Sequence, residues 1–103
     1  MQEPTFLILT SLAAGPQHGY GIMTDVSQIS ADRVRLRPGT LYAALDRLTT
    51  GGLIEADHEE IVDTRLRRYY RLTQHGMAEL AAETERLRAN AAVAIRRLRL
   101  AGQ

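Results

Sequence analysis

The chain has 103 residues, a net charge of only +1 at pH 7 and no cysteine. This length predicts one domain with a modest core, and the absence of cysteine excludes disulfides, thiolate catalysis and cysteine-bound metal. No apolar run approaches the length of a membrane span, and the first residues lack the order of a signal peptide, so we expect a cytoplasmic protein with no membrane partner.

Two helices are expected in the first third of the chain. The first begins near Pro4, which suits a first helical turn, and ends at Gly15-Pro16. The second is expected over residues 18–29. Its inward side is expected to hold Tyr20, Ile22, Met23, Val26 and Ile29. Gly19 and Gly21 fall in its first turn, where glycine disfavours a helix, so another group is expected to approach the backbone closely there.

A third helix is expected after a short strand. Residues 33–37 alternate arginine with apolar residues, which predicts a half-buried strand with its arginines outward. The helix is expected over residues 38–50, with a buried stripe of Leu41, Leu45 and Leu48. The opposite face at its start holds Gly39, Thr40 and Ala43, with Tyr42 beside them. A helix start this bare, with arginines on either side, indicates a surface that a ligand approaches closely.

Two strands joined by a polar tip are expected next. The strands cover residues 53–57 and 65–72, and residues 58–64 form the tip between them. The inward face of the second strand holds Leu66, Tyr70 and Leu72, and Arg68 interrupts this pattern. Its outward face holds Arg65, Arg67, Tyr69 and Arg71. His58 lies among acidic residues, but no second histidine is near it in the sequence, so no metal site is expected.

A long last helix is expected to follow Thr73, its N-cap, although Gly76 stands where a capping box would have a glutamate. Its apolar and small residues recur every three or four positions: Met77, Leu80, Thr84, Leu87, Ala91, Ala94 and Leu98. This seam is too long for so small a domain to cover, so it predicts a dimer interface with a second copy. The small residues in the seam either let two helices pack tightly or leave a cavity for an effector near Phe6, Thr84 and Ala91.

The arginines are concentrated in one part of the chain. All thirteen basic residues are arginine, and eight of them lie between Arg33 and Arg71. Codon bias in a GC-rich genome explains the absence of lysine, whereas the clustering is typical of a protein with a polyanionic partner. Five acidic residues dilute the same region: Glu55, Asp57, Glu59, Glu60 and Asp63.

Three helices, a two-stranded hairpin and a long helix, in this order, predict a mainly α (α+β) fold of the winged helix-turn-helix class. We expect residues 1–72 to form a DNA-binding domain and residues 73–103 to form a dimerisation helix, together as one compact unit. In such folds the third helix enters the major groove of DNA, which accounts for its bare face.

The predicted contacts with double-stranded DNA come from the starts of the second and third helices and from the second strand. They are His18, Gly19, Tyr20, Pro38, Gly39, Thr40, Tyr42, Ala43, Arg65 and Arg67. A helix start offers free backbone N–H groups to phosphate, and Ala43 can touch a thymine methyl group. The alternatives to DNA contact are a helix cap for His18, a core position for Tyr20, and packing at the edge of the core for Tyr42 with its hydroxyl in solvent. For Arg65 and Arg67 the alternative is a solvated strand face with ion pairs to Glu55 or Asp57.

The motifs of the chain resemble those of the PadR-type transcriptional regulators in order and spacing. The matching segments are Pro4-Thr5-Phe6, Gly15-Pro16-Gln17-His18-Gly19-Tyr20, Gly39-Thr40-Leu41-Tyr42, Arg47-Leu48, Gly52-Leu53-Ile54-Glu55, Arg68-Tyr69-Tyr70-Arg71-Leu72-Thr73 and Gly76. The single C-terminal helix looks like that of the short-chain subgroup. The resemblance implies a homodimer that represses transcription from a pseudo-palindromic operator and is released by a small aromatic or drug-like effector.

The chain departs from the family pattern at three points. Ala43 stands where many members have proline, the expected wing tip is acidic and lacks glycine, and no tryptophan is available to stack on an effector. The acidic tip favours the alternative of a winged-helix module for protein–protein contact without DNA readout. The arginines of the second strand favour DNA. No nucleophile–base pairing or phosphate-cradling loop is present, so neither an enzyme nor a cofactor is expected.

Overall fold

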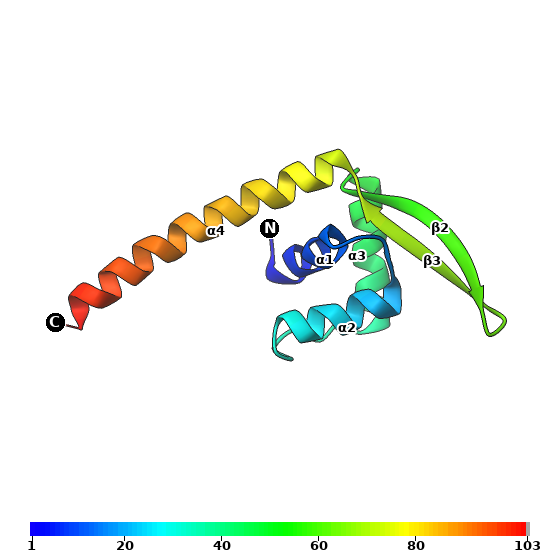
Figure 1. Cartoon of the computed structure of the whole chain (residues 1–103), viewed down its shortest axis with the longest axis horizontal. Coiled ribbons are helices and arrows are strands. Elements are labelled where there is room, and N and C mark those ends of the chain that lie inside the picture. The colour runs from blue at the N-terminus through cyan, green and yellow to red at the C-terminus, as the bar shows by residue number, and fades with distance from the viewer. Residues whose placement is uncertain (103) are drawn as a thin grey trace.

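The computed structural model describes residues 1–102 and confirms the predicted mainly α fold with a winged helix-turn-helix (Figure 1). Its elements are α1 (Glu3–Ala13), β1 (Gln17–His18), α2 (Gly19–Ile29), α3 (Pro38–Thr50), β2 (Ile54–Val62), β3 (Arg65–Leu72) and α4 (Gln74–Ala101). The first three helices form a body, the β2–β3 hairpin extends from one side of it and α4 from the other. The molecule therefore measures 61 × 27 × 20 Å. None of the helices in residues 1–102 has the length and apolar character that crossing a membrane requires.

The core lies between α1, α2 and α3. The buried stripe predicted for α3 is confirmed, since Leu41, Leu45 and Leu48 are all buried. The inward side predicted for α2 is partly wrong. Ile22 and Val26 are buried, but Tyr20 is 73% exposed because it precedes Ile22 by two residues and so lies on the opposite side of the helix. Ile29 is also exposed, in the last turn of α2 beside the exposed residues Gln28 and Ala31.

The strand predicted over residues 33–37 is wrong. This segment is a loop in which Leu36 is buried and Val34 half-buried, as the alternation predicted. A strand also needs a neighbour to pair with, and β1 occupies the third place in the sheet, whose order is β1-β3-β2. The loop is held instead by the buried Ser30, whose Oγ accepts a hydrogen bond from the backbone N–H of Val34 at 3.0 Å.

The β2–β3 hairpin, which we call the wing, is longer than predicted. The polar tip expected over residues 58–64 is wrong, because β2 continues to Val62 and only Asp63 and Thr64 form the turn. Both have positive φ angles, 51° and 65°, as a two-residue hairpin turn requires. Leu66 is 59% exposed rather than inward, because the distal half of the wing extends beyond the helices (Figure 1).

Helix α4 is joined to the body at its first turns. The predicted cap is confirmed: Thr73 Oγ1 accepts a hydrogen bond from Gly76 N–H at 2.9 Å and donates one to the Gly52 carbonyl at 2.6 Å. A Cβ atom at Gly76 would overlap the carbonyl oxygen of Leu53, so glycine replaces the expected glutamate because the helix passes too close to the backbone there. The last residue of the predicted dimerisation helix, residue 103, lies outside the described residues.

Candidate nucleic-acid interface

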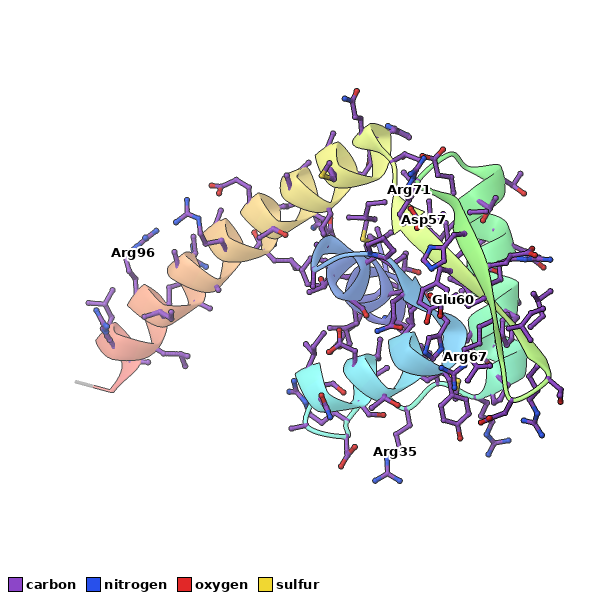
Figure 2. All side chains as sticks on the ribbon, turned by 45° about the vertical axis from the view of Figure 1, so that its right-hand side comes forward. Arg35, Asp57, Glu60, Arg67, Arg71 and Arg96 are labelled. Atoms are coloured by element: carbon purple, nitrogen blue, oxygen red, sulfur yellow. The ribbon has the colours of Figure 1, made fainter. Side chains whose placement is uncertain are left out.

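Three separate segments of the chain line one groove between the body and the wing. The first turn of α2, the exposed side of α3 and strand β3 meet there, and Figure 2 shows Arg67 of the wing close to the start of α2. Six of the residues predicted to contact DNA line this groove: His18, Gly19, Tyr20, Tyr42, Arg65 and Arg67. The structure thus brings together residues that are up to 49 positions apart in the sequence.

The remaining predicted residues lie on the other side of α3. Gly39, Thr40 and Ala43 line a second depression, between α3 and the start of α1. Pro38 is exposed at the first position of α3. The exposed face of α3 is therefore flanked by two depressions, with Tyr42 on the side of the wing and Thr40 on the side of α1.

The glycines of the site separate into two kinds. A Cβ atom at Gly19 would lie 2.6 Å from the Tyr42 hydroxyl oxygen, so the predicted close approach to the start of α2 is confirmed and Tyr42 is the group that makes it. Tyr42 packs on the backbone of Gly19 and is still 49% exposed. At Gly39, by contrast, none of the described atoms lies within 4 Å of where a Cβ would be. The fold therefore does not require a glycine at position 39, and the start of α3 is open to an external group.

His18 joins the start of α2 to the wing. Its Nδ1 accepts a hydrogen bond from the Gly21 N–H at 3.2 Å, as the helix-cap alternative requires. Its ring also meets the ring of Tyr69 edge-on, with the centroids 5.2 Å apart. Burial, reinforced by the positive charge of Arg67, lowers the pKa of His18 below 6.5. A neutral ring keeps Nδ1 free to accept the capping bond.

The arginines of the wing are divided between paired and unpaired ones. Arg71 bonds to Glu55 at 2.9 Å and to Asp57 at 3.2 Å, while Arg68 lies 3.4 Å from Glu59. Within residues 1–102, no acidic side chain lies within ion-pair distance of Arg65 or Arg67. The alternative that paired these two arginines with Glu55 or Asp57 is therefore wrong. The acidic residues of β2 are engaged elsewhere, and Arg65 and Arg67 remain available to an anion.

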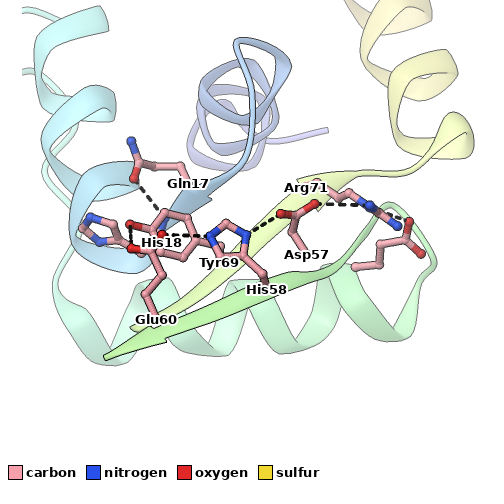
Figure 3. A network of polar contacts seen from close by, with 8 residues as sticks. Gln17, His18, Asp57, His58, Glu60, Tyr69 and Arg71 are labelled. Atoms are coloured by element: carbon pink, nitrogen blue, oxygen red, sulfur yellow. Dashed lines mark hydrogen bonds and ion pairs between the residues drawn. The ribbon is translucent and has the colours of Figure 1, made fainter. Parts of the chain in front are cut away.

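A network of polar contacts covers the outer face of the wing (Figure 3). His58 Nδ1 lies 2.5 Å from Asp57 and its Nε2 lies 3.3 Å from Glu60, which also accepts a hydrogen bond from the Tyr69 hydroxyl at 3.1 Å. The rings of His58 and Tyr69 stack with centroids 4.2 Å apart. The hydrogen bond to Asp57 raises the pKa of His58 above 6.5. Within residues 1–102, no group of three or more His, Asp or Glu side chains is placed to hold a metal ion.

The network was not predicted, because it depends on an irregularity in the sheet. The register of β2 and β3 shifts between Ala56 and Glu59, so that two residues of β2 stand opposite Tyr69. Asp46 of α3 was also missed, although it lines the groove. Its spacing of three residues after Ala43 and seven after Gly39 could have placed it on the bare face of the helix.

We expect the two histidines of the site to titrate on opposite sides of 6.5. The pKa of His18 is lowered by folding, so its stabilising contribution is complete above 6.5 and is lost as the pH falls through its folded pKa. The pKa of His58 is raised, so its contribution is complete below 6.5 and is lost as the pH rises through its folded pKa. Ring chemical shifts measured by NMR against pH, with His58→Gln to assign the signals, test this order. A higher pKa for His18 than for His58 would contradict it.

The seam of α4 leads away from the body. Leu80 is half-buried and packs against the core, whereas the later seam residues are exposed in the single chain. Leu98, near the end of the seam, is 71% exposed. Of the residues predicted for an effector, Thr84 and Ala91 are exposed along α4, and Phe6 is half-buried in α1.

Comparison with known proteins gives a consistent result. The model of the transcriptional regulator PadR-like family matches residues 8–82. A transcriptional regulator of Mycobacterium tuberculosis is 36% identical over 80 residues, which are 78% of this chain and 71% of that protein. A PadR family transcription regulator from Clostridium difficile has a TM-score of 0.76 at 26% identity, covering 94% of this chain and 99% of that one. The PadR of Bacillus subtilis, solved with operator DNA, has a TM-score of 0.71 at 26% identity; 82% of this chain spans 48% of that one.

Proposed function

Because this chain belongs to the PadR-like family of transcriptional regulators, we propose that it represses transcription as a homodimer bound to a pseudo-palindromic operator in double-stranded DNA. The observation that carries this proposal is the groove that Arg65 and Arg67, which form no ion pair within residues 1–102, line together with Tyr42 and Asp46 of α3. Family members are regulators and not enzymes, so the site is one for binding.

In the proposed complex, α3 lies in the major groove and its first N–H groups meet phosphate. Thr40, Tyr42 and Ala43 then face base edges or the sugar-phosphate backbone. The open space at Gly39 supports this approach, because no atom of residues 1–102 lies within 4 Å of where its Cβ would be. Arg65 and Arg67 contact phosphates from the wing, which adds affinity and orientation but carries no sequence information.

Two subunits are needed because one helix reads too few base pairs for useful specificity. Half-sites on one face of B-DNA are separated by about 34 Å, so the two α3 helices must be held at that spacing. The seam of α4 supports a dimer with this role. It continues the face on which Leu80 packs against the body, and its later residues have no cover within residues 1–102.

Release by a small aromatic effector is part of the same proposal. In the dimer, Thr84 and Ala91 leave space between the helices near Phe6 of α1, and α1 packs against α4. Ligand binding there would change the spacing of the two α3 helices. Titration of a panel of flat aromatic compounds against the protein–DNA complex tests whether an effector releases the DNA. Failure of every compound to displace DNA would contradict the proposed effector site.

The salt dependence of binding separates DNA recognition from the alternative of a protein–protein module. With a random-sequence duplex, the wild-type affinity is expected to fall steeply between 50 and 200 mM salt, at roughly 0.9 counterion per phosphate contact. Arg67→Ala is expected to flatten the slope by about one counterion per subunit. Arg96→Ala removes the same charge from α4, far from the groove (Figure 2), and is expected to leave the slope unchanged. Equal slopes for wild type and Arg67→Ala would remove Arg67 from the interface.

A further inference from the structure

Asp46 lies at the centre of the face of α3 that the proposed function directs toward DNA. It follows Gly39 by seven residues and Ala43 by three, so the three residues form one stripe along the helix. The buried residues of α3, Leu41 and Leu45 among them, occupy the opposite side. Asp46 is exposed and lines the groove together with Tyr42.

No ion pair within residues 1–102 accounts for a carboxylate at this position. Three arginines of the wing line the same groove, yet none of the described residues forms an ion pair with Asp46. The acidic residues of β2 differ in this respect, since Glu55, Asp57 and Glu59 each pair with an arginine. The negative charge of Asp46 therefore has no paired arginine among the described residues, although it lies on the surface that would approach the phosphates of DNA.

The chemistry of the major groove defines what such a carboxylate can bind. An ionised carboxylate only accepts hydrogen bonds, and the phosphates repel it. The base edges in the major groove offer donors only at the amino groups of cytosine and adenine, and aspartate pairs with that of cytosine. Guanine and thymine offer the carboxylate no donor there, and adenine places its N7 acceptor beside its amino group, so each of these bases lowers the affinity relative to cytosine.

We propose that Asp46 determines specificity by accepting a hydrogen bond from the N4 amino group of one cytosine in each half-site. The assignment rests on the proposed function, because it requires α3 to enter the major groove. Asp46 lowers the affinity for DNA in general and raises the selectivity among sequences. This role differs from that of Arg65 and Arg67, which strengthen binding to every sequence alike.

Selection from a random-sequence duplex library tests the assignment, using wild type, Asp46→Ala and Asp46→Asn. The wild-type motif is expected to contain one cytosine per half-site whose preference falls by about 5- to 150-fold in Asp46→Ala. In Asp46→Asn the preference is expected to move to adenine, because asparagine pairs with the N6 and N7 atoms of adenine. Both variants are expected to bind unselected duplex more tightly than wild type, since each subunit loses one negative charge.

Asp63→Asn is the matched control. Asp63 lines the same groove from the turn of the wing, where asparagine also tolerates the positive φ angle. This variant is expected to bind unselected duplex more tightly without a change of motif. If Asp46→Ala selects the same sequences as wild type, the role of Asp46 is overturned and the proposed function stands. If the wild type retains no duplex at all, the proposed function is overturned, and the assignment of Asp46 with it.

Discussion

Leu87→Glu is expected to yield a monomer that no longer binds two half-sites on one DNA molecule. Leu87 is at the middle of the seam and is exposed in the single chain, and the partner helix of the proposed dimer would cover it. The glutamate would be buried unpaired against the partner helix, at a cost of several kcal/mol. Light scattering at micromolar concentration measures the oligomeric state, and duplex binding measured on the same sample is expected to be weakened.

The same substitution on the other side of α4 provides the control. Leu100 is exposed like Leu87, but it lies two residues after Leu98 and therefore faces away from the seam. Leu100→Glu is expected to remain a dimer and to bind duplex like wild type. A stable dimer of Leu87→Glu would show that the seam is not the interface.

Gly76→Ala is expected to destabilise the fold by roughly 3 kcal/mol, at the upper end of the usual cost of overpacking. The added Cβ atom would overlap the carbonyl oxygen of Leu53, which is a backbone atom and cannot rotate away. Relief requires α4 to move off the body, which also breaks the hydrogen bond that Thr73 Oγ1 donates to the Gly52 carbonyl. The midpoint of urea denaturation, followed by circular dichroism, measures the loss.

Gly39→Ala is the matched control for this effect. Position 39 is also near the start of a helix, but no atom lies within 4 Å of the added Cβ. Alanine favours helix over glycine by about 1 kcal/mol, so the stability is expected to be unchanged or slightly raised. Binding to duplex is expected to weaken, because the added methyl group stands where the backbone of DNA approaches. A wild-type midpoint for Gly76→Ala would contradict the close contact with Leu53.

The sequence predicted correctly those elements whose boundaries, caps and buried positions depend on nearby residues. Helix α3 begins and ends where Pro38 and Gly51 predicted, and its leucines are buried because their spacing allows only one inward face. The cap of α4 was likewise predictable from Thr73 alone. These features depend on residues within a few positions of one another.

The errors concern features that depend on distant parts of the chain. Residues 33–37 alternate like a strand, but β1 takes the place beside β3 through pairs such as His18 with Tyr69. The bulge opposite Tyr69 and the extension of β2 to Val62 are set by the pairing with β3. The candidate site likewise depends on contacts between distant parts of the chain. Sequence spacing grouped the residues of α3, whereas only the fold shows that Arg65 and Arg67 are unpaired beside Tyr42.

The most direct test of the DNA-binding face is a map of backbone amide chemical shifts, recorded by NMR as a random-sequence duplex is added to the labelled protein. The largest changes are expected at Gly39, Tyr42 and Arg67, because these residues lie at the exposed face of α3 and in the groove beside it. The amide of Arg96, far along α4, is expected to stay unchanged (Figure 2). Changes confined to α4 or to the outer face of the wing, with none in α3, would contradict the account.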